Sequence, residues 1–177
     1  LYGCGLRRQE ALALTVFDVD LHRKEISVNK AHEFNSLTGY KAAVKDTKSA
    51  NGARVVPIPD KIYPVLEKYV QSRRATGKVY LFTMRGGEPC SKSSYIRMWK
   101  RIVKELNRVA DEPIEGLTAH IFRHNYCTEL CYQIPKVSIK KIAELLGDTE
   151  KMVIEVYNHV LQEKEDAVGA VNDALNF

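Results

Sequence analysis

The sequence predicts a mainly helical domain that carries a small three-stranded antiparallel β-sheet in its first third. Residues 25–59 contain short strand-like runs separated by turn residues. From residue 60 onward, apolar residues recur at spacings of three and four, which is the pattern of amphipathic helices. With 177 residues, 45% of them hydrophobic and 28% charged, the chain can form one globular domain with a real core.

The predicted sheet follows a short helical segment. Residues 7–14 are rich in helix formers and are expected to end a helix. Strands are expected at 25–28, 43–48 and 54–59, the last of which ends at its prolines. Asn51-Gly52 favours the positive φ angles of a tight hairpin, so we expect a turn between the second and third strands.

The remainder of the chain is expected to be helical. Asp60 is a plausible N-cap for a helix that ends at Gly77, with apolar positions 62, 65, 66, 69 and 70 on one face. Thr118 can cap the next helix but one, and Gly147 can close the one after that. The further helices are expected at residues 91–107, 120–132, 138–146, 150–157 and 163–175.

Charge and hydropathy narrow the class of protein. The chain has 27 Lys and Arg against 22 Asp and Glu, a net charge of +5 that suits a polyanionic partner. No window approaches the roughly 18 apolar residues that a membrane helix needs, and no signal peptide is visible. We expect a cytoplasmic protein, and because residue 1 is Leu we expect a fragment whose upstream domains are missing.

The cysteines are too sparse for a disulfide scaffold and contain no Cys-x-x-Cys pair. We expect small apolar core residues in a reducing compartment. The alternative is a metal site, since Cys127 and Cys131 share a helix face on which His120 or His124 could join them. The four cysteines are Cys4, Cys90, Cys127 and Cys131.

His120 and Arg123 form the first candidate for chemistry. They are three residues apart on a predicted helix, so they share a face. The guanidinium group of an arginine can hold two phosphate oxygens, and a histidine beside it can hydrogen-bond the same phosphate or move a proton. A buried structural His–Arg pair is the alternative.

Three other candidates are ordinary when each is taken alone. Arg7 has Glu10 three residues later, a pair that usually lies on a solvated helix surface. Lys48 precedes the predicted turn, where it is either a solvated charge or a proton donor to a leaving oxygen. Tyr157 is one of nine tyrosines, and a core position is the alternative to a nucleophile.

The order and spacing of these residues resemble the tyrosine recombinase, or phage integrase, family over essentially all 177 residues. That family has an Arg in a Gly-x-Arg-x-x-Glu segment, a Lys in a β-hairpin, a His-x-x-Arg-His helix, a Leu-Gly-His segment and a Tyr near the C-terminus. The matching residues, in chain order, are Arg7, Lys48, His120, Arg123 and Tyr157.

The resemblance implies the fold of a tyrosine recombinase catalytic domain, the DNA breaking-rejoining fold, over residues 1–177, and a role for each residue. Tyr157 would attack a DNA phosphate and form a 3′-phosphotyrosine bond. Arg7 and Arg123 would stabilise the charge that develops on the phosphate oxygens. Lys48 would protonate the leaving 5′-oxygen, and His120 would accept a hydrogen bond or a proton from the nucleophile. This chemistry needs neither metal, cofactor nor ATP, since the covalent bond stores the phosphodiester energy.

One position departs from the family pattern. The family usually has His or Trp after Leu-Gly, and this chain has Asp148, a possible sixth site residue. Asp148 could orient a cation, point away, or cap the helix that starts near Thr149, and capping is the simplest interpretation. A second ambiguity concerns two adjacent arginines, of which the Gly-x-Arg-x-x-Glu spacing selects Arg7 over Arg8.

The expected partner is double-stranded DNA, in the setting of a phage or conjugative element. An apolar strip on the last predicted helix suggests docking on a neighbouring subunit in a tetramer on DNA, with a monomer when free; packing on its own domain is the alternative. The rival functions are a type IB topoisomerase and a non-cleaving DNA-binding module. The apolar strip comprises Ala167, Val168, Val171 and Leu175. The candidate contacts to DNA phosphates are the loop 41–45 and the basic residues Arg97, Lys100, Arg101 and Lys104.

Overall fold

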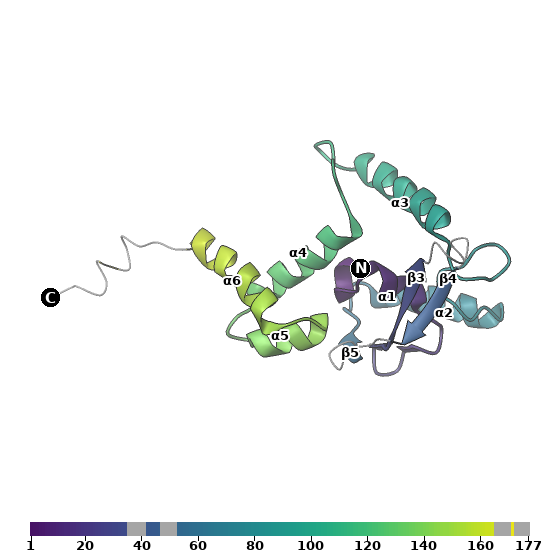
Figure 1. The fold of residues 1–177 in the computed structure, drawn as a ribbon, viewed down its shortest axis with the longest axis horizontal. Helices are drawn as coiled ribbons and strands as arrows, with labels where there is room; N and C mark the ends of the chain where they lie inside the picture. The colour runs from purple at the N-terminus through teal and green to yellow at the C-terminus, as the bar shows by residue number, and fades with distance from the viewer. Residues whose placement is uncertain (35–41, 47–52, 165–170, 172–177) are drawn as a thin grey trace.

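The computed structural model describes residues 1–34, 42–46, 53–164 and 171, and it is mainly helical with short antiparallel strands. Figure 1 shows α4, α5 and α6 grouped at the C-terminal side, apart from the strands, α1 and α2. The elements are η1 (Tyr2–Cys4), α1 (Arg8–Ala13), β1 (Val19–Asp20), β2 (Glu25–Val28), β3 (Lys30–Phe34), β4 (Ala42–Asp46), β5 (Arg54–Pro57), α2 (Tyr63–Ala75), α3 (Lys92–Asn107), α4 (Ala119–Cys131), α5 (Ile139–Leu146) and α6 (Glu150–Lys164).

The predicted three-stranded antiparallel sheet is present, but one of its strands differs from the prediction. The sheet has the order β1-β2-β5, with Ile26 opposite Val56. Strand β4 lies in a separate two-stranded ribbon with β3, so the expected hairpin between residues 43–48 and 54–59 is wrong. The observed pairing buries Ile26, Val28 and Val56 together in the first core cluster, which explains why β5 joins β2.

Local capping signals placed several helix ends correctly. The Thr118 hydroxyl accepts a hydrogen bond from the Ile121 backbone N–H at 3.4 Å and begins α4. Gly147 closes α5 with a φ of 62°, a left-handed conformation that glycine adopts without strain. The residue predicted to cap α2 does not do so: Asp60 instead forms an ion pair with Lys24.

Helix α6 is longer than predicted. It runs through Tyr157 to Lys164 rather than ending near the tyrosine, because no glycine or proline interrupts it. The helix predicted at 163–175 falls almost wholly outside the described residues, as does the turn around Asn51-Gly52.

Two core clusters position the functional residues. The first joins η1, α1 and the three-stranded sheet, and the second joins α4, α5 and α6.

All four cysteines are free and buried, as predicted, and burial raises the pKa of the Cys127 thiol to about 12. Within the described ranges there is no cluster of metal-ligating side chains, so the alternative metal site is not supported. No helix of the described residues has the length and apolar character that crossing a bilayer requires.

Candidate active site

Arg7 is held at the start of α1 by the residues around it. It follows Gly5, whose φ of 58° lets the chain turn sharply before the helix. The Arg7 backbone N–H donates to Glu10 Oε2 at 2.7 Å, and its Nη1 donates to Glu10 Oε1 at 2.9 Å. Its Nη2 donates to the Gly147 carbonyl at 2.8 Å and to Asp148 Oδ2 at 3.1 Å. Arg7 thus connects the start of the chain to the turn between α5 and α6.

Arg123 reaches the same place from α4. Its side chain is 6% exposed, and it donates to the Gly5 carbonyl at 2.7 Å and to Asp148 Oδ2 at 2.9 Å. Burial lowers the pKa of Arg123, with a smaller contribution from the charge of Arg7, and the hydrogen bond to Asp148 opposes both. The structure thus brings Arg7 and Arg123 together at Asp148.

Asp148 bridges the two arginines through a single carboxylate oxygen. Burial alone would raise the pKa of Asp148, but the hydrogen bond from Arg123, a backbone hydrogen bond from Thr149 and the charge of Arg7 together lower it. The simplest interpretation from the sequence, that Asp148 caps α6, is wrong: the Thr149 hydroxyl accepts from the Met152 backbone N–H at 3.4 Å and occupies the capping position. Orientation of a cation, the first alternative, describes the observed contacts.

A buried ion pair between Glu10 and Arg54 lies next to Arg7 and holds the carboxylate that Arg7 contacts. Glu10 is 3% exposed rather than solvated, and both of its oxygens accept from Arg54, at 3.0 and 2.8 Å. Burial would raise the pKa of Glu10, but the bonds from Arg54 and Arg7 lower it. Sequence reasoning missed this pair. The signal that could have found it is the alternation of side chains along a strand, which puts residues 54, 56 and 58 on the same face. Val56 and Ile58 are apolar and buried, so Arg54 faces the core with them.

His120 lies beside Arg123 on the solvent-exposed side of the arginine cluster. It is exposed on α4, one turn before Arg123, and both line a cavity of about 410 Å³ together with Arg7. This cavity brings together three of the five residues that match the family pattern. The other residues that line the cavity are Arg8, Gln9, Tyr95, Trp99, Thr118 and Ala119.

Tyr157 lies on α6, the helix that borders the cluster. A smaller cavity of about 60 Å³ is lined by His120, Arg123 and Asp148 on one side and by Val153 and Val156 of α6 on the other. Tyr157 itself is half-buried and packs against the second core cluster rather than lining either cavity. Lys48 lies outside the described residues.

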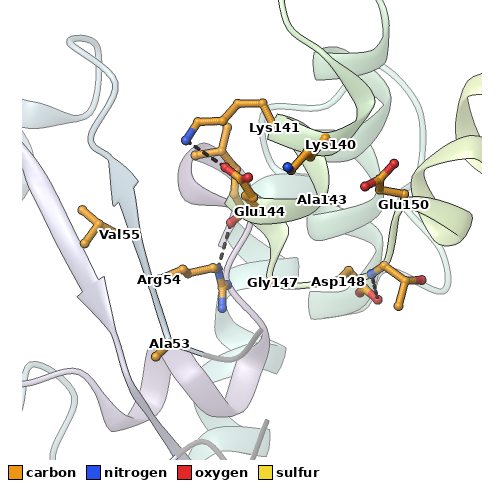
Figure 2. A pocket seen from close by; sticks show the side chains of 12 residues that line it. Ala53, Arg54, Val55, Lys140, Lys141, Ala143, Glu144, Gly147, Asp148 and Glu150 are labelled. Atoms are coloured by element: carbon orange, nitrogen blue, oxygen red, sulfur yellow. Dashed lines mark hydrogen bonds and ion pairs between the residues drawn. The ribbon is translucent and has the colours of Figure 1, made fainter. Parts of the chain in front are cut away.

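A larger groove of about 710 Å³ runs beside the arginines, between β5 and α5. Figure 2 shows Arg54 pointing from β5 toward α5, where its Nε donates to the Leu145 carbonyl at 2.8 Å. The groove carries equal numbers of basic and acidic side chains, so its charge does not favour a polyanion as the arginine cluster does. The basic ones are Arg54, Lys140 and Lys141, and the acidic ones are Glu144, Asp148 and Glu150.

Comparison with known proteins finds one family throughout. The phage integrase family profile matches residues 1–164. The chain is 31% identical to a tyrosine recombinase XerC-like protein of Caldanaerobacter subterraneus subsp. tengcongensis, over 97% of this chain and 47% of that protein. It is 26% identical to the transposase from transposon Tn916 of Enterococcus faecalis, over 90% of this chain and 40% of that protein. The chain thus spans about half the length of the curated relatives it matches or less.

The structure matches a solved protein as well. The Tn1549 transposon integrase in complex with circular intermediate DNA superposes with a TM-score of 0.73 and is 26% identical, over 89% of this chain and 52% of that one. This agreement confirms the fold class that the sequence predicted.

Proposed function

Because this chain belongs to the phage integrase family, we propose that it is the catalytic domain of a tyrosine recombinase that cleaves and rejoins DNA strands through a 3′-phosphotyrosine intermediate. The relatives with transposon names support a mobile genetic element as its setting. Double-stranded DNA is the proposed substrate, and the solved neighbour bound to DNA supports it.

One observation carries the proposal. Arg7 and Arg123 come from distant parts of the chain, share one carboxylate oxygen, and line the same open cavity as His120. Fixed guanidinium groups beside an open cavity can stabilise the negative charge that develops on a phosphate during in-line attack. Because each arginine is anchored by a hydrogen bond to a backbone carbonyl, little reorganisation is needed when a phosphate enters.

The remaining roles are those that the family resemblance implies for each residue. The Tyr157 hydroxyl attacks the phosphorus, the 3′-phosphotyrosine bond forms, and the 5′-oxygen leaves with a proton from Lys48. His120 accepts the proton that the Tyr157 hydroxyl gives up as it attacks. The 5′-hydroxyl of another strand then attacks the phosphotyrosine and restores the tyrosine. For the first attack, the Tyr157 oxygen must come within about 3.5 Å of a phosphate held by the arginines.

Covalent trapping tests the proposal. The complete product of the gene is mixed with a pool of nicked duplexes of random sequence, and complexes that survive detergent are collected. We expect trapping by the parent protein and by Tyr132→Phe, and none by Tyr157→Phe. Tyr132 is the matched control because it packs against the same core cluster as Tyr157. If Tyr157→Phe still traps DNA, the nucleophile is assigned wrongly.

The alternatives give different results in the same system. Relaxation of supercoiled plasmid without site preference would indicate a type IB topoisomerase. Binding to many sites without a covalent product would indicate a non-cleaving module. Arg123→Ala is expected to abolish cleavage and leave much of the DNA binding, and equal loss of both would mean that Arg123 only holds DNA.

The proposed assembly is a monomer when free and a tetramer on DNA, joined through the apolar positions of residues 167–175. Mass measurement of the protein with and without DNA tests this. Truncation after residue 164 is expected to leave a monomer on DNA, and a tetramer that survives truncation would exclude this contact.

A further inference from the structure

Asp148 makes the one contact, among the described residues, that joins the two active-site arginines directly. Its Oδ2 accepts from Arg7 at 3.1 Å and from Arg123 at 2.9 Å. The other contacts of the two arginines go to separate groups: Arg7 reaches Glu10 and the Gly147 carbonyl, and Arg123 reaches the Gly5 carbonyl. Backbone carbonyls thus anchor each arginine separately, and the Asp148 carboxylate is the side chain that ties the two guanidinium groups to each other.

We propose that Asp148 is a positioning residue of the DNA-cleavage site, which fixes the spacing of Arg7 and Arg123 and at the same time weakens the site's hold on the DNA phosphate. The inference rests on the proposed function. It assigns a role to the position where this chain departs from the family's histidine or tryptophan.

The positioning effect follows from charge. Two nitrogens that both lie within hydrogen-bond distance of one oxygen are held close together, and the positive charges they carry repel each other. Arg123 is buried, so this repulsion is poorly screened there. The carboxylate between them cancels it, and removal or displacement of the carboxylate lets the arginines move apart.

The weakening effect follows from the N–H donors that the arginines leave unused and from the net charge of the cluster. A guanidinium group has five N–H donors, of which Arg7 uses three and Arg123 uses two in the contacts above. Donors therefore remain for a phosphate while Asp148 stays in place. The cluster contains three guanidinium groups and two carboxylates, so Asp148 leaves it one net positive charge. An incoming phosphate meets a fixed anion beside its binding groups, and this lowers its affinity.

Two substitutions separate the two effects. Asp148→Asn keeps the size and removes the charge, while Asp148→Glu keeps the charge and moves the carboxylate by one methylene. Glu144→Gln is the matched control, since Glu144 lies near Asp148 beside the groove of Figure 2 and is paired with Lys141 at 3.2 Å instead of with either arginine.

The binding readout is a titration with inorganic phosphate, followed by the NMR signals of the arginine side chains in this 20.1 kDa chain. The cleavage readout is the single-turnover rate of covalent-complex formation at saturating nicked DNA, measured on the complete gene product. We expect phosphate to bind Asp148→Asn at least threefold more tightly and Asp148→Glu as it binds the parent. We expect both variants to cleave at least tenfold more slowly, and Glu144→Gln to match the parent in both readouts.

Parent-like cleavage by both variants would overturn the positioning role, and unchanged or weaker phosphate binding by Asp148→Asn would overturn the electrostatic one. Equal thermal unfolding midpoints for parent and variants separate these outcomes from misfolding. If the parent protein forms no covalent complex, the proposed function fails, and the phosphate titration still decides whether Asp148 restrains an anion site between Arg7 and Arg123.

Discussion

Replacing Arg54 with methionine is expected to destabilise the whole domain, because the arginine neutralises a buried carboxylate. Its side chain is 5% exposed and donates to both oxygens of Glu10 and to the Leu145 carbonyl. Methionine has a similar length and no donor. The substitution leaves Glu10 buried with Arg7 as its remaining cation and removes the link from β5 to α5.

The magnitude follows from the burial of the pair. Breaking a buried ion pair by removing one partner costs about 3–5 kcal/mol. The total free energy of unfolding of a globular domain is about 5–15 kcal/mol, so this loss is a large part of the stability. For a chain of this length each kcal/mol lowers the midpoint of thermal unfolding by roughly 2–4 °C, which gives a drop of roughly 6–20 °C.

Thermal and urea unfolding of the parent and Arg54→Met measure the effect. Arg108→Met is the matched control, because the Arg108–Glu105 pair has the same 2.8 Å distance but a 70% exposed arginine, and we expect no measurable change. In a double-mutant cycle with Glu10→Gln, which removes the uncompensated charge, we expect the two losses to be non-additive by about 1–3 kcal/mol. A loss below about 1 kcal/mol for Arg54→Met, or additive losses in the cycle, would refute the reasoning.

The same pair gives a pH signature. The pKa of Glu10 is lower in the folded state than its ordinary value of 4.5, so its contribution to stability is complete above that value. The contribution is lost as the pH falls through the lowered pKa. Arg54→Met is expected to show a smaller acid-dependent loss than the parent.

Two further substitutions test other parts of the fold. His32 is 1% exposed, and within the described part of the chain neither of its ring nitrogens has a hydrogen-bond partner. Burial lowers its pKa below the ordinary 6.5, so the unfolded chain binds the proton more readily and stability falls as the pH drops below about 6.5. Between pH 7.5 and 5.5 the urea midpoint of the parent should fall more than that of His32→Phe, and parallel curves would contradict this. Gly5→Ala would place a Cβ 2.4 Å from the Tyr126 ring at a φ of 58° and displace the carbonyl that holds Arg123, so we expect slower cleavage and lower stability. Gly77→Ala has the same left-handed backbone but open space, and only a small loss of stability is expected; equal losses would mean that the contact with Tyr126 is unimportant.

Local features of the fold were predictable because they depend on neighbours in sequence. Thr118 and Gly147 mark the ends of helices through hydrogen bonds or backbone angles within a few residues. Strand pairing was not predictable in the same way. The partner of β5 is set by burial of Val28 and Val56 across a long stretch of chain, and the short-range turn signal gave a different answer.

In the candidate site too, the sequence identified residues through local motifs but did not reveal contacts between distant parts of the chain. The order of motifs identified Arg7, His120 and Arg123, and the structure brings them to one cavity. The contacts that hold the arginines depend on residues far apart in sequence, which is why the roles of Arg54 and Asp148 were missed or misassigned. The position of Tyr157 against the second core cluster likewise depends on how α6 packs.

The identity of the nucleophile is the central claim, and mass spectrometry of the trapped complex tests it most directly. Trypsin digestion releases residues 152–164 as one peptide, MVIEVYNHVLQEK, in which Tyr157 is the single tyrosine. After nuclease treatment of the covalent complex, we predict that this peptide carries the mass of a 3′-phosphonucleotide on Tyr157. A nucleotide on any other peptide, or a trapped complex in which this peptide is unmodified, would contradict the account.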